Sequence, residues 1–121
     1  LHYQVKKSQA KLVRVLVGEI FDVFVDLRKS SKYFGLWQGV VLSSDHKYQL
    51  YIPKGFAHGY YVKSNIAIIS YKTSDFWYPD YERTIIWDDP DLAIDWGNKI
   101  TPVISQKDQR GLSFHQSHFF K

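Results

Sequence analysis

The stretch KLVRVLVGEIFDVFVDL, Lys11–Leu27, contains two strongly apolar runs separated by Gly18 and Glu19. The first run contains three valines and the second two valines, two phenylalanines and an isoleucine, residues that favour β-strands. A glycine between two such runs is typical of a turn. The stretch therefore predicts two strands, Lys11–Val17 and Ile20–Leu27, joined as a hairpin.

The second of these runs has two different faces. The wholly apolar face consists of Phe21, Val23, Val25 and Leu27, at a spacing of two. The other face carries two carboxylates and consists of Ile20, Asp22, Phe24 and Asp26. For an isolated strand this pattern favours contact with solvent. In a barrel the same face would point into the lumen, around a polar site.

The rest of the chain contains further short β-rich runs, separated by turn clusters such as KSSK, SSDHK and KSN. The predicted strands are Leu36–Leu42, Gln49–Ile52, His58–Val62, Ile66–Thr73 and Thr84–Trp87. The segment DDPDLAIDWGNKITP predicts a loop with one helical turn, and the tail QRGLSFHQSHFFK an edge segment or a frayed end. Many short strands without an amphipathic helix predict an all-β fold, an antiparallel sandwich or barrel of the jelly-roll type.

Composition limits the possible functions. A chain of 121 residues predicts a single domain over residues 1–121. The absence of cysteine excludes disulfides and thiolate chemistry within this sequence. The net charge of +4 is scattered, which argues against nucleic acid and leaves room for a small anionic ligand. No apolar run approaches the length of a membrane span and no signal peptide is visible, so we expect no membrane contact and a cytoplasmic location.

The motif IPKGFAHGY, Ile52–Tyr60, places one histidine beside a predicted turn. Pro53 ends the preceding strand, and Gly55 permits a tight turn. Gly59 lets a backbone or a ligand approach His58 closely. An imidazole exchanges protons near neutral pH, but a lone histidine beside a turn is more often structural.

The titratable residues offer two kinds of chemistry, metal binding and acid–base catalysis. Metal binding is not expected, because the histidines are scattered and only the last two lie close in sequence: His2, His46, His58, His115 and His118. Moving a proton on carbon beside a carbonyl needs a base, an acid on the other face and a group that stabilises the enolate. Histidine, tyrosine and lysine can fill these roles, although their presence alone does not single out the reaction.

Several long runs carry a more specific signal. They are LHYQ, KLVRVLVGEIFDVFVDLR, FGLWQGVVLS, QLYIPKGFAHGY, SYKTSDFWYP, YERTIIWDDPDLAIDW and ISQKD. In this order and spacing, over nearly the whole chain, they resemble the dTDP-4-dehydrorhamnose 3,5-epimerase family. The resemblance implies a cupin-type jelly roll that works without a metal or other cofactor, and a homodimer. It also implies a dTDP-4-keto-6-deoxyhexose substrate, epimerised at C3 and C5 on the route to dTDP-L-rhamnose.

The resemblance further implies roles for particular residues. His2 in LHYQ matches the catalytic base, and Asp108 in SQKD matches its carboxylate partner. Tyr71 in SYK matches the acid that works from the opposite face of the sugar. Lys11 and His58 match residues that hold the sugar and the developing enolate.

Other positions match substrate contacts or supporting groups. Glu82 and Lys107 match further substrate contacts, and Trp77 falls where an aromatic side chain lies near the nucleotide. Asp22, on the polar face of the second strand, is expected to support Lys11 or a histidine.

This sequence departs from the family pattern at its start. Family members carry a substantial segment before LHYQ that includes strands and phosphate- and base-binding residues, so we expect this sequence to be a fragment or to lack its natural beginning. Three alternatives stay open: a non-catalytic nucleotide-sugar-binding relic, a sister enzyme that epimerises only C3 or only C5, and a metal cupin.

Overall fold

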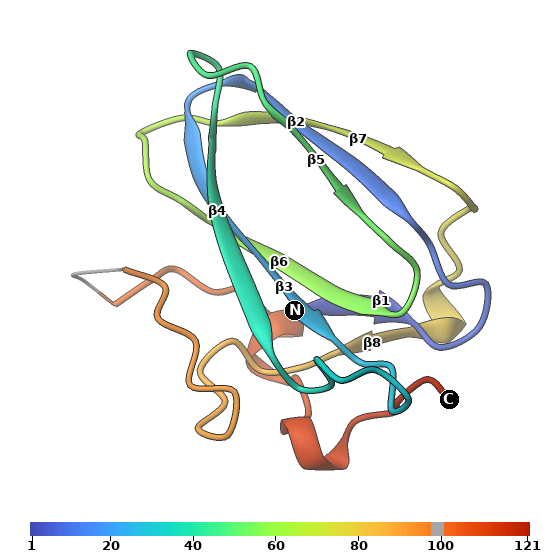
Figure 1. Cartoon of the computed structure of the whole chain (residues 1–121). Helices are drawn as coiled ribbons and strands as arrows, with labels where there is room; N and C mark the ends of the chain where they lie inside the picture. Colours follow the sequence, from blue (N-terminus) through green and yellow to red (C-terminus); the bar gives the residue numbers. More distant parts are fainter. Residues whose placement is uncertain (98–100) are drawn as a thin grey trace.

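A computed structural model describes residues 1–97 and 101–121. Within them, a five-stranded sheet in the order β4-β3-β6-β1-β8 faces a three-stranded sheet in the order β5-β2-β7 (Figure 1). The strands are β1 (His2–Gln4), β2 (Lys11–Val17), β3 (Glu19–Asp26), β4 (Trp37–Ser43), β5 (Gln49–Ile52), β6 (Phe56–Val62), β7 (Ile68–Thr73) and β8 (Glu82–Thr84). The helical turns are η1 (Pro79–Tyr81), α1 (Gln106–Gln109) and η2 (Phe114–Gln116). All strand pairs are antiparallel, and the predicted all-β fold is confirmed.

The predicted hairpin at Gly18 is wrong. Strand β2 pairs with β5 and β7, whereas β3 pairs with β4 and β6, so the two strands belong to different sheets. Gly18 has a φ of 84°, and a Cβ atom there would collide with the carbonyl oxygen of Ile66. The chain crosses between the layers in a turn that only glycine fits.

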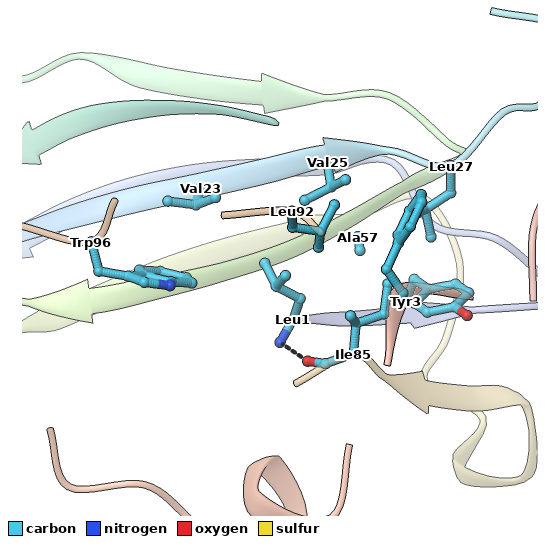
Figure 2. Packing of buried hydrophobic residues seen from close by; sticks show 10 residues of the cluster. Leu1, Tyr3, Val23, Val25, Leu27, Ala57, Ile85, Leu92 and Trp96 are labelled. Carbon is cyan, nitrogen blue, oxygen red and sulfur yellow. Dashed lines mark hydrogen bonds between the residues drawn. The ribbon is translucent and has the colours of Figure 1, made fainter. Parts of the chain in front are cut away.

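The apolar face of β3 packs away from the smaller sheet. Figure 2 shows Val23, Val25 and Leu27 on one side of the larger sheet, against residues of β1 and of the C-terminal segment. In the same view the main-chain nitrogen of Leu1 donates to the Ile85 carbonyl at 3.0 Å. This core covers one face of the larger sheet and confirms that the face is apolar.

The carboxylate face of β3 points between the two sheets. Asp22 and Asp26 are buried there, so contact with solvent is ruled out and the lumen alternative is confirmed. Arg28 donates to both oxygens of Asp26, at 2.9 and 2.8 Å. The second core lies in the same layer and consists of Val13, Val15, Ile20, Leu42 and Ile52.

The tail docks onto the larger sheet. Phe114 is buried, and the backbone N–H of Phe120 donates to the Leu27 carbonyl at 3.0 Å. The frayed-end alternative is therefore wrong, because aromatic side chains hold this segment against the core. One helical turn lies in the predicted loop after Trp87, where the backbone N–H of Ala93 donates to the Asp89 carbonyl at 2.9 Å, and residues 98–100 of that loop are outside the described residues.

Strand boundaries differ from prediction near β1 and β8. The predicted strand Thr84–Trp87 lies instead at Glu82–Thr84, where β8 pairs with β1. Strand β1 itself has only three residues, too few to show a period in the sequence. No helix in the described part of the chain is long and apolar enough to cross a membrane.

Candidate active site

A cavity of about 620 Å³ lies between the inner faces of the two sheets. Most of the predicted site residues line it: His2, Lys11, His58, Tyr71, Trp77, Glu82 and Asp108. The other two, Asp22 and Lys107, contact lining residues through hydrogen bonds. The fold thus brings together residues that are scattered along the chain.

Strand register explains this convergence. His2 of β1 lies opposite His58 of β6 in the larger sheet. In the smaller sheet Val13 of β2 lies opposite Tyr71, and Lys11 lies two residues before Val13 on the same face. The two histidines therefore face the lysine and the tyrosine across the cavity.

His2 lies between two carboxylates. Its Nε2 is hydrogen-bonded to Asp108, and its Nδ1 lies 3.2 Å from Glu82 Oε1. Asp108 is held in turn by Ser105, the N-cap of α1, whose hydroxyl donates to the carboxylate at 2.8 Å. Burial opposes ionisation of Asp108, but the hydrogen bonds from His2 and Ser105 hold its pKa below its ordinary value. Asp108 is therefore a fixed carboxylate that can orient the His2 ring.

A second histidine–carboxylate pair forms the buried wall of the cavity. His58 Nε2 lies 2.8 Å from Asp22 Oδ2, and both side chains are almost fully buried. Burial lowers the pKa of His58, although Asp22 acts in the opposite direction. A neutral His58 donates from Nε2 to Asp22, so its other ring nitrogen is a hydrogen-bond acceptor.

Lys11 of β2 projects from the smaller sheet and lines the cavity. Burial lowers its pKa, because the charged ammonium loses hydration, whereas the carboxylates of Glu82 and Asp22 favour the charged form. A cation so placed can stabilise an oxyanion that forms within the cavity.

Tyr71 offers a phenol on the same side as Lys11. Burial raises its pKa strongly, and neighbouring Tyr60 and Asp22 add to the effect. Its ring meets His58 edge-on with centroids 6.0 Å apart, and lies 6.4 Å from the ring of Tyr60. Tyr71 therefore keeps its proton at ordinary pH and can act as an acid.

The rim of the cavity combines a charged pair with an exposed ring. Lys107 is ion-paired with Glu82, and its ammonium lies 5.9 Å from the centroid of the Trp77 ring. The Trp77 side chain is largely exposed at 62%. An exposed ring beside a cation suits stacking of a flat, electron-rich group.

Sequence reasoning did not single out some residues that contribute to the site. Tyr60 lines the cavity and lies two residues after His58 on β6, so the period of a strand could have indicated it. Ser105 precedes Asp108 by three residues, a spacing typical of helix N-caps. Trp96, which also lines the cavity, carries no such signal.

The arrangement supports proton transfer on both faces of a bound molecule. A histidine with a carboxylate partner lies on one sheet, and a protonated phenol beside a lysine lies on the other. Within residues 1–97 and 101–121, no group of three or more His, Asp or Glu side chains is arranged to hold a metal ion.

The family model for dTDP-4-dehydrorhamnose 3,5-epimerase matches residues 1–116. The chain belongs to this family. It is 51% identical over 120 residues to the dTDP-4-dehydrorhamnose 3,5-epimerase of Pseudomonas aeruginosa, covering 99% of this chain and 66% of that protein. It therefore spans slightly less than two thirds of that relative.

Solved structures of epimerases share the fold. The Legionella pneumophila enzyme, in complex with dTDP-4-keto-L-rhamnose, superposes with a TM-score of 0.89 at 50% identity, covering 92% of this chain and 59% of that one. ChmJ, a 3′-monoepimerase from Streptomyces bikiniensis in complex with dTDP-quinovose, gives a TM-score of 0.86 at 29% identity, covering 93% of this chain and 57% of that one.

Proposed function

We propose that this chain carries the active site of an enzyme that epimerises C3 and C5 of dTDP-4-keto-6-deoxyglucose, giving dTDP-4-keto-L-rhamnose. The observation that carries the proposal is the placement of His2 and Tyr71 on opposite sheets of one cavity. Membership of the epimerase family supports the same reaction.

The reaction needs proton removal from one face of the sugar and proton return from the other. The C4 ketone makes the protons on C3 and C5 acidic. His2, oriented by Asp108, takes the proton, and Tyr71 gives one back from the opposite face. Each inversion leaves His2 protonated and Tyr71 deprotonated, so both must exchange with water before the next one.

Negative charge moves to the ketone oxygen as the proton leaves. Lys11 is the cation placed to stabilise this enolate, because neutral His58 already donates its Nε2 proton to Asp22. The free nitrogen of His58 is an acceptor and suits a sugar hydroxyl. Lys11 thus stabilises the enolate, while His58 holds the sugar.

The nucleotide end of the substrate is assigned to the rim. Trp77 offers a ring for the thymine base, and Lys107 a cation beside it. Glu82 lies between this rim and His2, and its carboxylate contacts both Lys107 and His2.

We also infer that the whole protein acts as a homodimer, with the cytoplasm as its expected location. Support comes from large apolar side chains exposed on the outer face of the smaller sheet, at Leu16, Tyr51 and Ile68, because exposed apolar surface is a feature of protein interfaces. Light scattering on the purified protein checks the mass; a monomer at all concentrations contradicts the inference.

Proton exchange tests the reaction directly. In deuterated water, with the protein present, we expect deuterium at both C3 and C5 of dTDP-4-keto-6-deoxyglucose, measured by NMR, together with the inverted product. Exchange at one carbon alone indicates a sister enzyme, and exchange at C3 alone would match the name of ChmJ, a 3′-monoepimerase. Binding without exchange at either carbon indicates a non-catalytic binder and rejects the proposal.

A further inference from the structure

Both ring nitrogens of His2 face carboxylates. Nε2 is bonded to Asp108, and Nδ1 lies 3.2 Å from Glu82. A neutral imidazole has one N–H and one lone pair, so only the imidazolium satisfies both contacts. An imidazolium cannot accept a proton. The arrangement seen in the structure is therefore the acid form of His2, and one contact must open before His2 can be a base.

The contact with Glu82 is the one that can open. Asp108 is anchored by the hydroxyl of Ser105, and its backbone N–H donates back to that hydroxyl at 3.1 Å. Among the residues that the structure describes, Glu82 has no such hydroxyl anchor on its carboxylate, and its second oxygen pairs with Lys107, whose side chain is half exposed. Two cations, His2 and Lys107, thus share one movable carboxylate.

We propose that Glu82 is a positioning residue that controls the proton on His2, holding Nδ1–H in the resting site and freeing Nδ1 by moving onto Lys107. The proposal rests on the proposed role of His2 as base. When the Nδ1 proton passes to water, the exposed lone pair repels the carboxylate, which turns to Lys107. The proton removed from the sugar then arrives on Nδ1, and Glu82 returns to hold it.

Within the described residues, the elements around His2 carry further charged or titratable groups. They are the Leu1 amino group, Lys11 of β2, His58 of β6 with Asp22 of β3, Arg83 of β8, and Asp108 and Lys107 of α1. Arg83 donates to the carbonyls of Asp80 and Glu82, at 2.9 and 2.7 Å, and so does not compete for the Glu82 carboxylate.

Nitrogen NMR of the histidine rings tests the proposal on the full chain without substrate. In Glu82→Gln we expect the pH midpoint for protonation of His2 to fall, because the carboxylate 3.2 Å from Nδ1 is lost. In Lys107→Gln we expect the midpoint to rise, since the carboxylate then belongs to His2 alone. Arg110→Gln, at the C-cap of α1, removes the same charge from a side chain outside the cavity and should leave the midpoint unchanged.

A double variant that combines Glu82→Gln with Lys107→Gln decides whether Lys107 acts through Glu82. If it does, Lys107→Gln has no effect on the midpoint when Glu82 is already glutamine. A shift of the same size in both backgrounds shows a direct effect of the lysine charge and overturns the proposal. An unchanged midpoint in Glu82→Gln overturns it as well.

Deuterium exchange then links this proton control to catalysis. The exchange rate should fall on the acid side of its pH profile. The pH at which it falls to half should be lower in Glu82→Gln and higher in Lys107→Gln. A half-rate pH that is unchanged in both variants overturns the catalytic part of the proposal. Absence of exchange in the wild type rejects the proposed function instead, whereas the ring midpoints still report on Glu82.

Discussion

Two histidines line one cavity in different surroundings. His58 is buried and its pKa is lowered, so it is neutral and donates to Asp22. His2 is less buried, and each of its ring nitrogens contacts a different carboxylate, Glu82 at Nδ1 and Asp108 at Nε2. The proposed function therefore gives the same residue type two roles: His58 holds the sugar, and His2 exchanges protons.

Replacing Tyr71 by phenylalanine should separate proton removal from inversion. His2 and Asp108 remain, so exchange of the substrate protons with deuterated water continues. Inversion should fall by about 10²–10⁴-fold, because the acid on the other face is lost. The two rates are read from the same NMR time course.

His2→Asn is the matched control for this variant, since it removes the base and should stop exchange and inversion together. The ring contact between residue 71 and His58 survives in Tyr71→Phe, so the thermal midpoint should hold. A Tyr71→Phe protein that inverts the sugar at the wild-type rate rejects the acid role.

Lys11→Met removes the ammonium while keeping an apolar side chain of similar length. We expect kcat to fall about 10²–10³-fold, because the enolate loses its stabilising cation. The free energy of unfolding should not fall, since burial already disfavours the charged form of Lys11. Steady-state kinetics and urea unfolding measure the two effects. A rise in KM with unchanged kcat would place Lys11 in substrate binding alone.

At the scale of elements, the passage from β2 to β3 builds the cavity. Gly18 sends consecutive strands into opposite sheets, so Lys11 of β2 faces Asp22 of β3 across the lumen rather than beside it. A hairpin at this point would have placed both residues in one layer. The local sequence pattern predicted both strands. It could not predict their pairing, in which β2 lies between β5 and β7 and β3 lies beside β6.

Gly18→Ala should destabilise the fold more than Gly97→Ala. Both glycines have positive φ, 84° and 65°, which costs about 1–2 kcal/mol for an L side chain. A Cβ at Gly18 also meets the Ile66 carbonyl, whereas no described atom lies within 4 Å of a Cβ at Gly97. Urea unfolding of both variants measures the difference. Equal losses of stability would contradict the steric role of the turn.

At the scale of the whole molecule, the buried pair of His58 and Asp22 couples stability to pH. The pKa of His58 lies below its ordinary value of 6.5 in the folded chain. Below about pH 6.5 the unfolded chain binds a proton that the folded chain does not, so the free energy of unfolding falls as the pH drops. We expect the thermal midpoint to decrease between roughly pH 7 and 5.

His58→Gln should lose less stability over this range, because its amide can still donate to Asp22 without titrating. At lower pH both proteins should lose stability together, since Asp26, Glu82 and Asp108 have lowered pKa values and become protonated. If the thermal midpoints of the two proteins fall in parallel between pH 7 and 5, the pH dependence does not come from His58.

The sequence alone determined most of the strands, the two faces of β3 and the family, because period, turn chemistry and long matching runs are local properties of the chain, whereas β1 and β8 are too short to show a period. The resemblance to the epimerase family also indicated His2, Asp108 and Tyr71 as candidate catalytic residues. Only the tertiary structure decided that β2 and β3 separate into two sheets and that the carboxylate face of β3 is buried. It alone placed Glu82 and Asp108 on opposite nitrogens of His2, since these side chains lie 80 and 106 residues away from it and meet only through packing of the two sheets and the C-terminal segment.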